Sequence, residues 1–427
     1  MKILHILGIG QLPPNPEQQA VGGTTRVVLE VSRQQAVEGH EVVAAVVGRE
    51  RWRVEWEGVR LVSLRSAAWA RLRMGPWKLD LSALLPLARL AVRERFDVIH
   101  AHEFNYLRYL PAGIRVTHFH NDPCRFTAEE ETGTWEINEC RAAARYSHAH
   151  VVVSRFIGEQ LCRRYQDLMS ALPAGFDPVT RTHVIYNGAD VDRFSPARWA
   201  AARRRIRADW NAEDNAVVFL FSGAVVPEKG VLPLAQAFAT LAESNPCARL
   251  VLAGGAEMWE DAGTDPAVKA EFANYHRRLR EQLAPLEARG QVVHLGLVPP
   301  VEMPGTYAAA DVVVVPSLVQ EACPLSALEA LAAGKPLVAS GVGGILEFAT
   351  SDNSILVPPG DTNALHRALV SLTEDDDRRE RLGRAARRSA QAFSWKRTAR
   401  ELDALYQDLM ARRHTIVCAT PPAFYRF

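Results

Sequence analysis

Two glutamates in the second half of the chain lie on either side of a predicted helix start. Glu321 follows a buried strand that ends at Ser317, and the helix begins at about Pro324, where proline loses no helical hydrogen bond. Glu329 lies five residues further on, roughly 7–8 Å along the helix. A helix start offers free N–H groups and positive potential, so two acids around it could bind the two sugars that flank a diphosphate. The alternative is a Glu329 that faces solvent, but its helix is otherwise apolar and a carboxylate there needs polar partners.

A lysine follows another predicted strand of the same half. The strand in FLFSGAVVPEKG ends at Gly223, a loop follows, and Lys229 and Gly230 precede a helix. A lysine in a loop at a strand end can serve as a point charge that binds phosphate. Taken alone, this segment is explained equally well by a solvated surface lysine.

Glycines mark the loop after the first predicted strand. Gly8 and Gly10 begin like a dinucleotide fingerprint, but a proline stands in place of its third glycine, so that interpretation is weak. Gly22 and Gly23 are more informative, because two glycines allow the backbone to approach a ligand and Thr24 could cap the helix that follows. An ordinary flexible loop is the alternative.

Two histidines end a predicted strand at the edge of the expected cleft. In VTHFHNDP, His118 and His120 share one face of the strand because side chains alternate. His120 could contact a sugar or polarise a phosphate, although a histidine at a strand end often has a structural role. A third option is a metal site built from His118, His120 and Asp122, although this is not a recognised ligand spacing.

Short apolar strands alternate with helical patterns on both sides of a polar segment, and this arrangement must position all of these residues. Near-continuous Val/Ile strands such as EVVAAVVG indicate parallel sheets covered by helices. The polar segment 187–199 carries turn signals, so we predict two doubly wound α/β domains with a ligand-binding cleft between them. The expected boundaries are an amino-terminal domain at 1–190, a linker at 191–204, a carboxy-terminal domain at 205–392, a terminal helix at 393–412 and a tail at 413–427.

Composition argues against several classes of protein. The 427 residues carry 50 Lys+Arg against 49 Asp+Glu, and a nucleic-acid binder would normally show a basic excess. No run of 18 apolar residues could span a bilayer, and the apolar start MKILHILGIGQ lacks the basic run and cleavage site of a signal peptide. Six cysteines without a C-x-x-C pair indicate reduced thiols in a cytoplasmic enzyme, with disulfides in a secreted protein as the alternative.

Taken in order along the chain, these motifs resemble those of retaining family-4 glycosyltransferases with the GT-B fold. The resemblance runs from the first residue to about residue 410. It implies two Rossmann-like domains that face each other across a cleft, with the carboxy-terminal helix crossing back to the first domain. The segments that carry it are Gly22-Gly23, GHEV, FDVIHAH, HND around His120, VIYNGADVDRFSP, PEKG around Lys229, the pair Glu321 and Glu329, and the glycines at 343–344.

The resemblance also implies a role for each candidate residue. Glu329 would hold the ribose hydroxyls of a nucleotide. His120, Glu321 and Lys229 would be catalytic: His120 contacts the transferred sugar near its anomeric centre, Glu321 holds the sugar, and Lys229 neutralises the diphosphate. The reaction would transfer a sugar from a nucleoside diphosphate sugar, with UDP as the expected nucleotide, to a hydroxyl acceptor with retention, without metal or other cofactor. Donor-binding contacts would also come from Gly22, Gly23, Gly223, Cys323, Leu325 and Ser326.

Two departures from the family pattern bear on the identity of the donor. The family places an arginine directly after the glycine of the lysine loop, whereas Ala224 follows Gly223 here, so one cation is missing or another arginine replaces it. The sequence Glu-Ala-Cys-Pro-Leu stands where the family has Glu-Gly-Phe-Gly-Leu. Pro324 cannot donate a backbone hydrogen bond, so one amide contact to the donor is lost.

The acceptor is not defined by a motif. The segment from Arg60 to Lys78 is basic and contains Trp69 and Trp77, which suits an anionic membrane surface or a lipid diphosphate, with an ordinary solvated surface as the alternative. We therefore expect a glycan or lipid-linked acceptor in bacterial surface polysaccharide or lipopolysaccharide assembly, and a cytoplasmic protein with peripheral contact to the plasma membrane. Two other functions remain open. One is a nucleotide-sugar 2-epimerase, which needs further carboxylates and histidines around the sugar, and the other is a nucleotide-sugar sensor without turnover.

Overall fold

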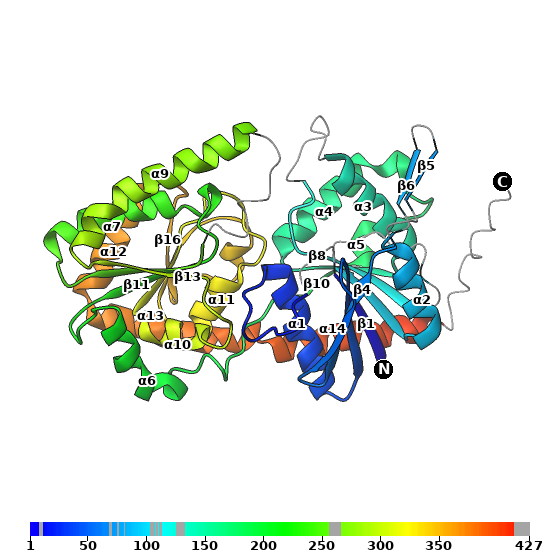
Figure 1. Ribbon diagram of the computed structural model, residues 1–427, viewed down its shortest axis with the longest axis horizontal. Helices are drawn as coiled ribbons and strands as arrows, with labels where there is room; N and C mark the ends of the chain where they lie inside the picture. Colours follow the sequence, from blue (N-terminus) through cyan, green and yellow to red (C-terminus); the bar gives the residue numbers. More distant parts are fainter. Residues whose placement is uncertain are drawn as a thin grey trace.

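The computed structural model shows two α/β units side by side along the long axis of the molecule (Figure 1). It describes residues 1–7, 12–67, 71–74, 77–80, 82–102, 107, 110, 113–124, 133–255 and 266–413. Gly8 and Gly10, and the predicted tail after its first residue, lie outside this part of the chain.

The first unit is built on an eight-stranded sheet of order β10-β9-β8-β7-β1-β2-β4-β3. Neighbouring strands run parallel except β3 and β4, which are antiparallel. The first strand lies inside the sheet because its apolar side chains are buried on both faces, as a continuous apolar run predicts. The strands are β1 (Lys2–Ile6), β2 (Glu41–Gly48), β3 (Trp52–Trp56), β4 (Val59–Arg65), β7 (Val98–His102), β8 (Ile114–Phe119), β9 (Ala149–Val152) and β10 (Thr182–Val184), with a separate hairpin of β5 (Arg71–Met74) and β6 (Trp77–Asp80).

The helices of the first unit connect these strands. The helix α1 is predicted by the sequence, because apolar residues recur on one face and Gly39 follows as a stop signal. In the structure Gly39 has φ +88°, which suits a glycine after a helix end. The elements are α1 (Gly23–Val37), α2 (Leu84–Glu94), α3 (Gly133–Tyr146), α4 (Arg155–Asp167), η3 (Met169–Ala171) and α5 (Pro178–Arg181).

The second unit holds a six-stranded parallel sheet of order β13-β12-β11-β14-β15-β16. In chain order these strands are arranged 3-2-1-4-5-6, the doubly wound order that the sequence predicts. The connections therefore diverge between the central strands β11 and β14. The strands are β11 (Val218–Ser222), β12 (Arg249–Ala253), β13 (Val292–Gly296), β14 (Val312–Val315), β15 (Leu337–Ser340) and β16 (Ser354–Val357).

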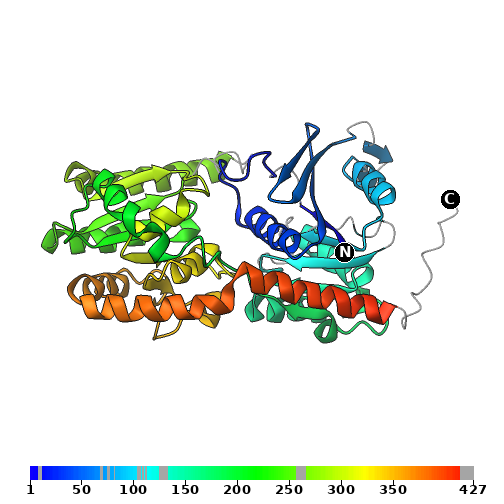
Figure 2. The ribbon, with the colours of Figure 1, turned by 90° about the horizontal axis from the view of Figure 1, so that it is seen from below.

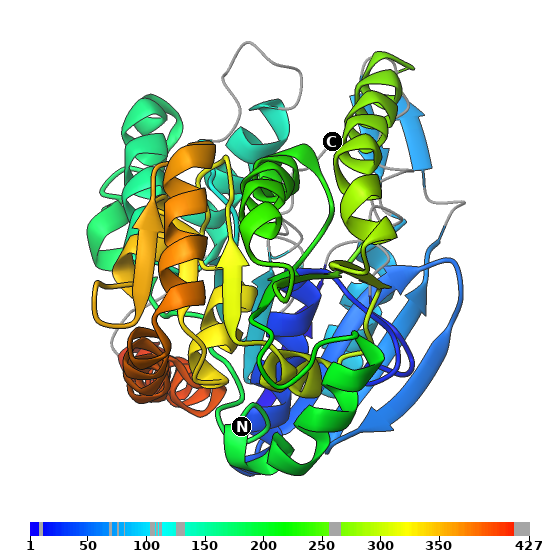
Figure 3. The ribbon, with the colours of Figure 1, turned by 90° about the vertical axis from the view of Figure 1, so that its left-hand side faces the viewer.

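Helices cover both faces of the second sheet. One apolar core joins α7, α9 and α12 to the sheet, and another joins α10 and α11 to its other face (Figure 3). This two-sided cover explains why the strands read as continuous Val/Leu runs. The elements are α6 (Pro196–Asp209), η4 (Pro227–Lys229), α7 (Val231–Ser244), α9 (Pro266–Ala288), α10 (Met303–Ala309), α11 (Leu325–Ala332), η5 (Gly343–Glu347), α12 (Thr362–Glu374), α13 (Asp376–Ser389), η6 (Ala390–Phe393) and α14 (Trp395–Arg413).

The last helix, α14, returns to the first unit and lies along it (Figure 2). Trp395, Leu402 and Tyr406 are buried in a core that they share with Ile3 and Val27 of the first unit. This confirms the predicted crossing of the carboxy-terminal helix. The predicted linker at 191–204 contains the start of α6, which packs against α10, and the domain boundaries themselves remain predictions.

Hydrogen bonds between the two units fix the loop that carries Glu321. Glu347 of η5 accepts hydrogen bonds from the backbone N–H groups of Arg155 and Phe156, both at 2.9 Å, and so binds the start of α4. The side chain of Asn187 donates to the carbonyl oxygen of Cys323 at 3.0 Å. The region that leads into α11 is thereby attached to the first unit.

Candidate active site

Lys229 and Glu321 follow the two central strands of the second sheet, β11 and β14. Ligands of doubly wound folds bind beyond the carboxyl ends of the strands at which the connections diverge. The ammonium nitrogen of Lys229 lies 2.7 Å from Glu321 Oε1, and the hydroxyl of Ser317 donates to the same oxygen at 2.5 Å. Glu321 is buried, while 35% of the Lys229 side chain is exposed, so the lysine end of this ion pair is accessible to solvent.

Glycines allow the two loops of this pair to pack closely. Gly230 has φ +69°, and a Cβ atom there would lie 1.9 Å from the carbonyl oxygen of Pro316. Gly343 has φ +49°, and its Cβ would lie 2.2 Å from the carbonyl oxygen of Glu321, which also accepts a 2.7 Å hydrogen bond from Gly344 N–H. These glycines are therefore required by close backbone contacts.

The helix α11 begins where the sequence predicts, with Pro324 as its N-cap. The N–H groups of Ala327 and Leu328 make the first bonds of the helix, both to the Pro324 carbonyl oxygen, at 3.2 and 3.4 Å. The N–H groups of Leu325 and Ser326 precede these bonds and belong to the unsatisfied donors of a helix start. They lie shortly after Glu321 in the chain, and together they give the site its capacity to bind an anion.

Cys323 is buried between Glu321 and this helix start. Its carbonyl oxygen is occupied by Asn187 of the first unit. Burial raises the pKa of its thiol to about 12, so the thiol stays protonated at neutral pH. The hydrogen bond from Asn187 to its carbonyl oxygen connects the loop around Cys323 to the first unit.

Glu329 lies one turn into α11 and is partly buried between the two units. Burial raises the pKa of its carboxyl group to about 7, and the guanidinium of Arg26 and the hydroxyl of Tyr307 oppose this rise. The solvent-facing alternative for Glu329 is therefore wrong. Its neighbours come from both units, because Arg26 lies on α1 and Tyr307 on α10.

Arg26 is a charged residue of this site that the sequence does not single out. Its Nη2 atom lies 2.7 Å from Glu30 Oε1, and Arg33 binds the other oxygen of Glu30 at 2.9 Å. Among the described residues, Arg26 Nη1 is buried without a hydrogen-bond partner. An Arg–Glu pair four residues apart is an ordinary helix pattern, so only the tertiary structure brings this guanidinium close enough to lower the pKa of Glu329.

The glycines at the start of α1 differ from the expectation in one respect. The helix begins at Gly23 with Gly22 as N-cap and without a side-chain cap, so the predicted capping role of Thr24 is wrong. A Cβ atom on Gly23 would meet nothing within 4 Å, so space lies in front of this residue. The N–H of Gly223, in contrast, is occupied by the carbonyl oxygen of Ala253 at 3.0 Å.

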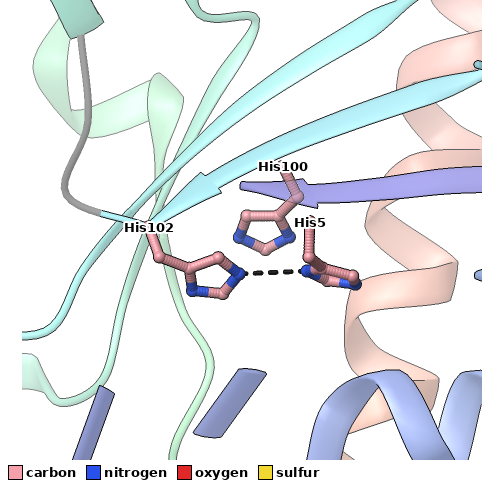
Figure 4. Close-up of side chains that lie close together, drawn as sticks. All are labelled: His5, His100 and His102. Carbon is pink, nitrogen blue, oxygen red and sulfur yellow. Dashed lines mark hydrogen bonds between the residues drawn. The ribbon is translucent and has the colours of Figure 1, made fainter. Parts of the chain in front are cut away.

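His120 directly follows β8 and is buried, and this burial lowers its pKa to about 3. Its ring is neutral at physiological pH and cannot serve as an acid there. His118 stacks on it with ring centroids 4.2 Å apart, which confirms that the two histidines share one face. Three further histidines, His5, His100 and His102, lie close by on β1 and β7 (Figure 4). The alternation in HAH signals that the last two share a face, but their approach to β1 requires the folded sheet.

The structure does not favour the option of a metal site with Asp122. Among the described residues, the nitrogens that lie close enough to those of His118 and His120 belong to His102, and the Asp122 carboxylate accepts a hydrogen bond from Cys124 N–H at 2.7 Å. Arg60, at the start of the basic segment, forms an ion pair with Glu94.

The predicted contact with a membrane remains a prediction, because much of the basic segment is not described. Residues 68–70, 75 and 76 lie outside the described residues, and the side chains of the hairpin strands β5 and β6 are not described. In the part of the chain that the structure describes, no helix is both long and apolar enough to cross a bilayer.

Two family models match the chain in sequence order. The model for Glycosyltransferase Family 4 matches residues 21–193, and the model for Glycosyl transferases group 1 matches residues 202–389. The first match begins at the glycines before α1, and the second contains Lys229, Glu321 and Glu329. Together the two matches span most of the chain, which belongs to the family-4 glycosyltransferases.

The chain is also similar to individual proteins of known name or structure. A D-inositol 3-phosphate glycosyltransferase from Corynebacterium glutamicum (strain R) is 34% identical over 252 residues, which are 58% of this chain and 56% of the relative. The chain thus spans about half the length of the curated relatives it matches. Sucrose-phosphate synthase from Thermosynechococcus elongatus shares the fold with a TM-score of 0.72 and 22% identity, over 96% of this chain and 100% of the other. Anabaena Alr3699/HepE in complex with UDP-glucose gives a TM-score of 0.72 at 19% identity, with the same coverage. These likenesses confirm the predicted GT-B fold.

Proposed function

We propose that this protein is a retaining glycosyltransferase that moves a sugar from a nucleoside diphosphate sugar, with UDP as the nucleotide, to a hydroxyl acceptor. The observation that carries the proposal is the Lys229–Glu321 ion pair, which lies at the switch point of the second sheet and shortly before the start of α11. A cation beside a helix start is suited to bind a diphosphate, and the two glutamates offer acceptors for sugar hydroxyls. The glycosyltransferase name of the curated relatives and the UDP-glucose bound to Alr3699/HepE support this donor class.

The geometry suggests how the leaving diphosphate would be stabilised. An ammonium group has three N–H donors, and Glu321 occupies one of them, so Lys229 retains donors for phosphate oxygens. The N–H groups of Leu325 and Ser326 would add to this stabilisation as negative charge develops. A phosphate oxygen would accept the proton of the attacking hydroxyl on the same face, so no protein carboxylate needs to act as nucleophile or base. This agrees with Glu321, whose Oε1 is already engaged by two donors.

Arg26 could replace the arginine that the family has at the position of Ala224. It approaches Glu329 from α1 of the first unit, and one of its terminal nitrogens has no partner among the described residues. We propose that this guanidinium binds the nucleotide part of the donor from the opposite side of the cleft. The free space before Gly23, three residues earlier on the same helix, is consistent with a ligand at this position.

The acceptor class rests on the names of the relatives and on the basic segment. The curated relative at 34% identity is named for D-inositol 3-phosphate, a phosphorylated polyol. A phosphorylated polyol is therefore the first acceptor to test. A glycan or lipid-linked acceptor of surface polysaccharide or lipopolysaccharide assembly is the second.

A screen of UDP-, ADP- and GDP-sugars by thermal shift, followed by mass spectrometry of the products, tests the proposal. We expect one nucleotide sugar to raise the melting temperature and its sugar to be transferred once an acceptor is added. Lys229→Met should abolish the shift, whereas the exposed Lys396→Met, as a matched control, should retain it. An epimerised sugar without acceptor would instead identify an isomerase, and binding without any turnover would identify a sensor. If no nucleotide sugar binds, the proposal is wrong.

A further inference from the structure

Five histidines of the first unit form one buried cluster around the ends of its central strands. They are His5 on β1, His100 and His102 on β7, His118 on β8 and His120 just beyond it, and each is at most 7% exposed. Figure 4 shows three of them, with the bond between His5 and His102 dashed. Only His120 is a candidate for contact with substrate, so the role of the others needs a separate explanation.

A continuous line of hydrogen bonds connects His120 to the last helix of the chain. His120 Nε2 lies 2.8 Å from His102 Nδ1, and His102 Nε2 lies 3.0 Å from His5 Nδ1. His5 Nε2 lies 2.8 Å from Gln35 Oε1 on α1, and Gln35 Nε2 lies 3.0 Å from Asp403 Oδ1 on α14. The line thus runs from the residue after β8 through β7, β1 and α1 to α14, and it ends on a carboxylate.

Asp403 fixes the direction of every bond in this line. A carboxylate only accepts, so Gln35 must turn its NH₂ group to Asp403 and its carbonyl oxygen to His5. His5 must then donate from Nε2 and accept at Nδ1. The same logic makes His102 donate from Nε2 to His5 and accept at Nδ1 from His120. Because burial lowers the pKa of His5 to about 4 and that of His120 to about 3, each of these two rings carries a single proton at neutral pH.

We propose that Gln35 and Asp403 are positioning residues that hold His120 in its Nε2–H tautomer. In this tautomer the other ring nitrogen of His120, Nδ1, carries no proton and can only accept hydrogen bonds. This inference rests on the proposed function, in which His120 contacts the transferred sugar: a sugar hydroxyl that meets Nδ1 must then donate its hydrogen bond to the ring. The crossing helix α14 would thereby determine which kind of hydrogen bond His120 can make.

A shared metal ion is the competing explanation for such a cluster. The nitrogens of His5, His100 and His102 lie within 4.8 Å of one another, as do those of His102, His118 and His120. However, the bonded nitrogen pairs are 2.8 and 3.0 Å apart, closer than the roughly 3.3 Å expected for two ligands of a tetrahedral zinc ion. The directed line also uses the lone pairs of His5 and His102. Hydrogen bonding therefore accounts for these distances better than metal binding.

Nitrogen NMR of the full chain labelled with ¹⁵N-histidine tests the proposal on the unmodified protein. For His120, assigned by comparison with His120→Asn, we expect a protonated Nε2 and an unprotonated Nδ1, unchanged between pH 5 and pH 8. A protonated Nδ1 would overturn the proposal. So would metal-shifted resonances accompanied by bound zinc, copper or nickel in elemental analysis. This readout needs no turnover, so it stands even if the proposed transferase activity fails.

The variant Gln35→Met, which has similar size but no polar atoms, tests the positioning role. We expect His120 to populate both tautomers and kcat to fall at least ~10-fold while the donor KM stays the same, since a catalytic histidine in the wrong tautomer can lose up to ~10⁴-fold in turnover. Asp403→Asn keeps an oxygen acceptor but adds an NH₂ donor, so it no longer fixes the direction of the line, and we expect it to change the tautomer and kcat in the same sense as Gln35→Met but less. The control is Thr117→Val, which removes a buried hydrogen bond to Ser147 outside the line and should leave the tautomer and kcat intact. A Gln35→Met protein with the wild-type tautomer would contradict the proposal.

Discussion

The two units hold their chemically active side chains in opposite ways. In the second unit, Lys229 and Glu321 form an ion pair at the edge of the site, where the lysine is partly exposed. In the first unit, five histidines are buried, and four of them, His5, His100, His102 and His120, are hydrogen-bonded to neutral groups. Burial lowers the pKa values of His5 and His120 to about 4 and 3. Desolvation disfavours an isolated charged imidazole, whereas two opposite charges stabilise each other. The second unit is thus suited to bind charge, and the first to offer oriented neutral groups.

The largest effect should follow from removing the acid of the ion pair. We expect Glu321→Ala to lower kcat at least ~100-fold, because it removes a preorganised contact to the sugar and leaves Lys229 without its partner. Steady-state transfer assays would measure this, with the exposed Glu243→Ala on α7 as the matched control. Wild-type kcat in Glu321→Ala would show that the charge-binding site lies elsewhere.

A smaller effect is expected from the acid within α11. Glu329→Ala should weaken nucleotide binding roughly 10-fold, the scale of one hydrogen bond to a charged group, with a lesser change in kcat. Titration calorimetry with UDP would measure the dissociation constant. Equal losses in kcat and affinity would indicate that Glu329 acts on the transferred sugar instead of the nucleotide.

Two glycines, one in each unit, should be required for different reasons: Gly343 for the fold of the backbone and Gly23 for ligand binding. Gly343→Ala should destabilise the protein by about 1–3 kcal/mol, because its φ is positive and its Cβ would strike the Glu321 backbone. Gly23→Ala should leave the melting temperature unchanged or slightly raised, since its Cβ meets nothing, while donor turnover falls. Thermal denaturation and transfer assays on both variants would distinguish these roles. A Gly23→Ala protein with normal turnover would place the donor away from α1.

A pH dependence of stability should also arise from Glu329. Its pKa is about 7 in the folded chain against 4.5 ordinarily, so between these values the folded state binds more protons than the unfolded state. Stability from this group therefore falls as pH rises through this window, and the penalty is complete above pH 7. The melting temperature of wild type relative to Glu329→Gln should decrease from pH 5 to pH 8. A constant difference would mean that the carboxylate is not buried in solution.

The sequence predicted the central strands well, because parallel strands covered on both faces appear as continuous apolar runs. It predicted the start of α11 to within one residue, because proline and the apolar pattern that follows are local signals. The edge strand β3 was missed although Trp52, Val54 and Trp56 alternate with exposed residues, since five residues at a sheet edge give a weak signal.

What the sequence by itself determined is therefore local: the strands, the helix starts, and the motif residues that end the strands of the second sheet. Because parallel strands end at the same edge, this also brought Lys229 and Glu321 together. Only the tertiary structure decided that the charge of Arg26 acts on Glu329 and that Asp403 is connected to His120. Those contacts depend on how α1, α11 and α14 pack, and a helix pattern shows which face is apolar but not which polar group of another element it meets.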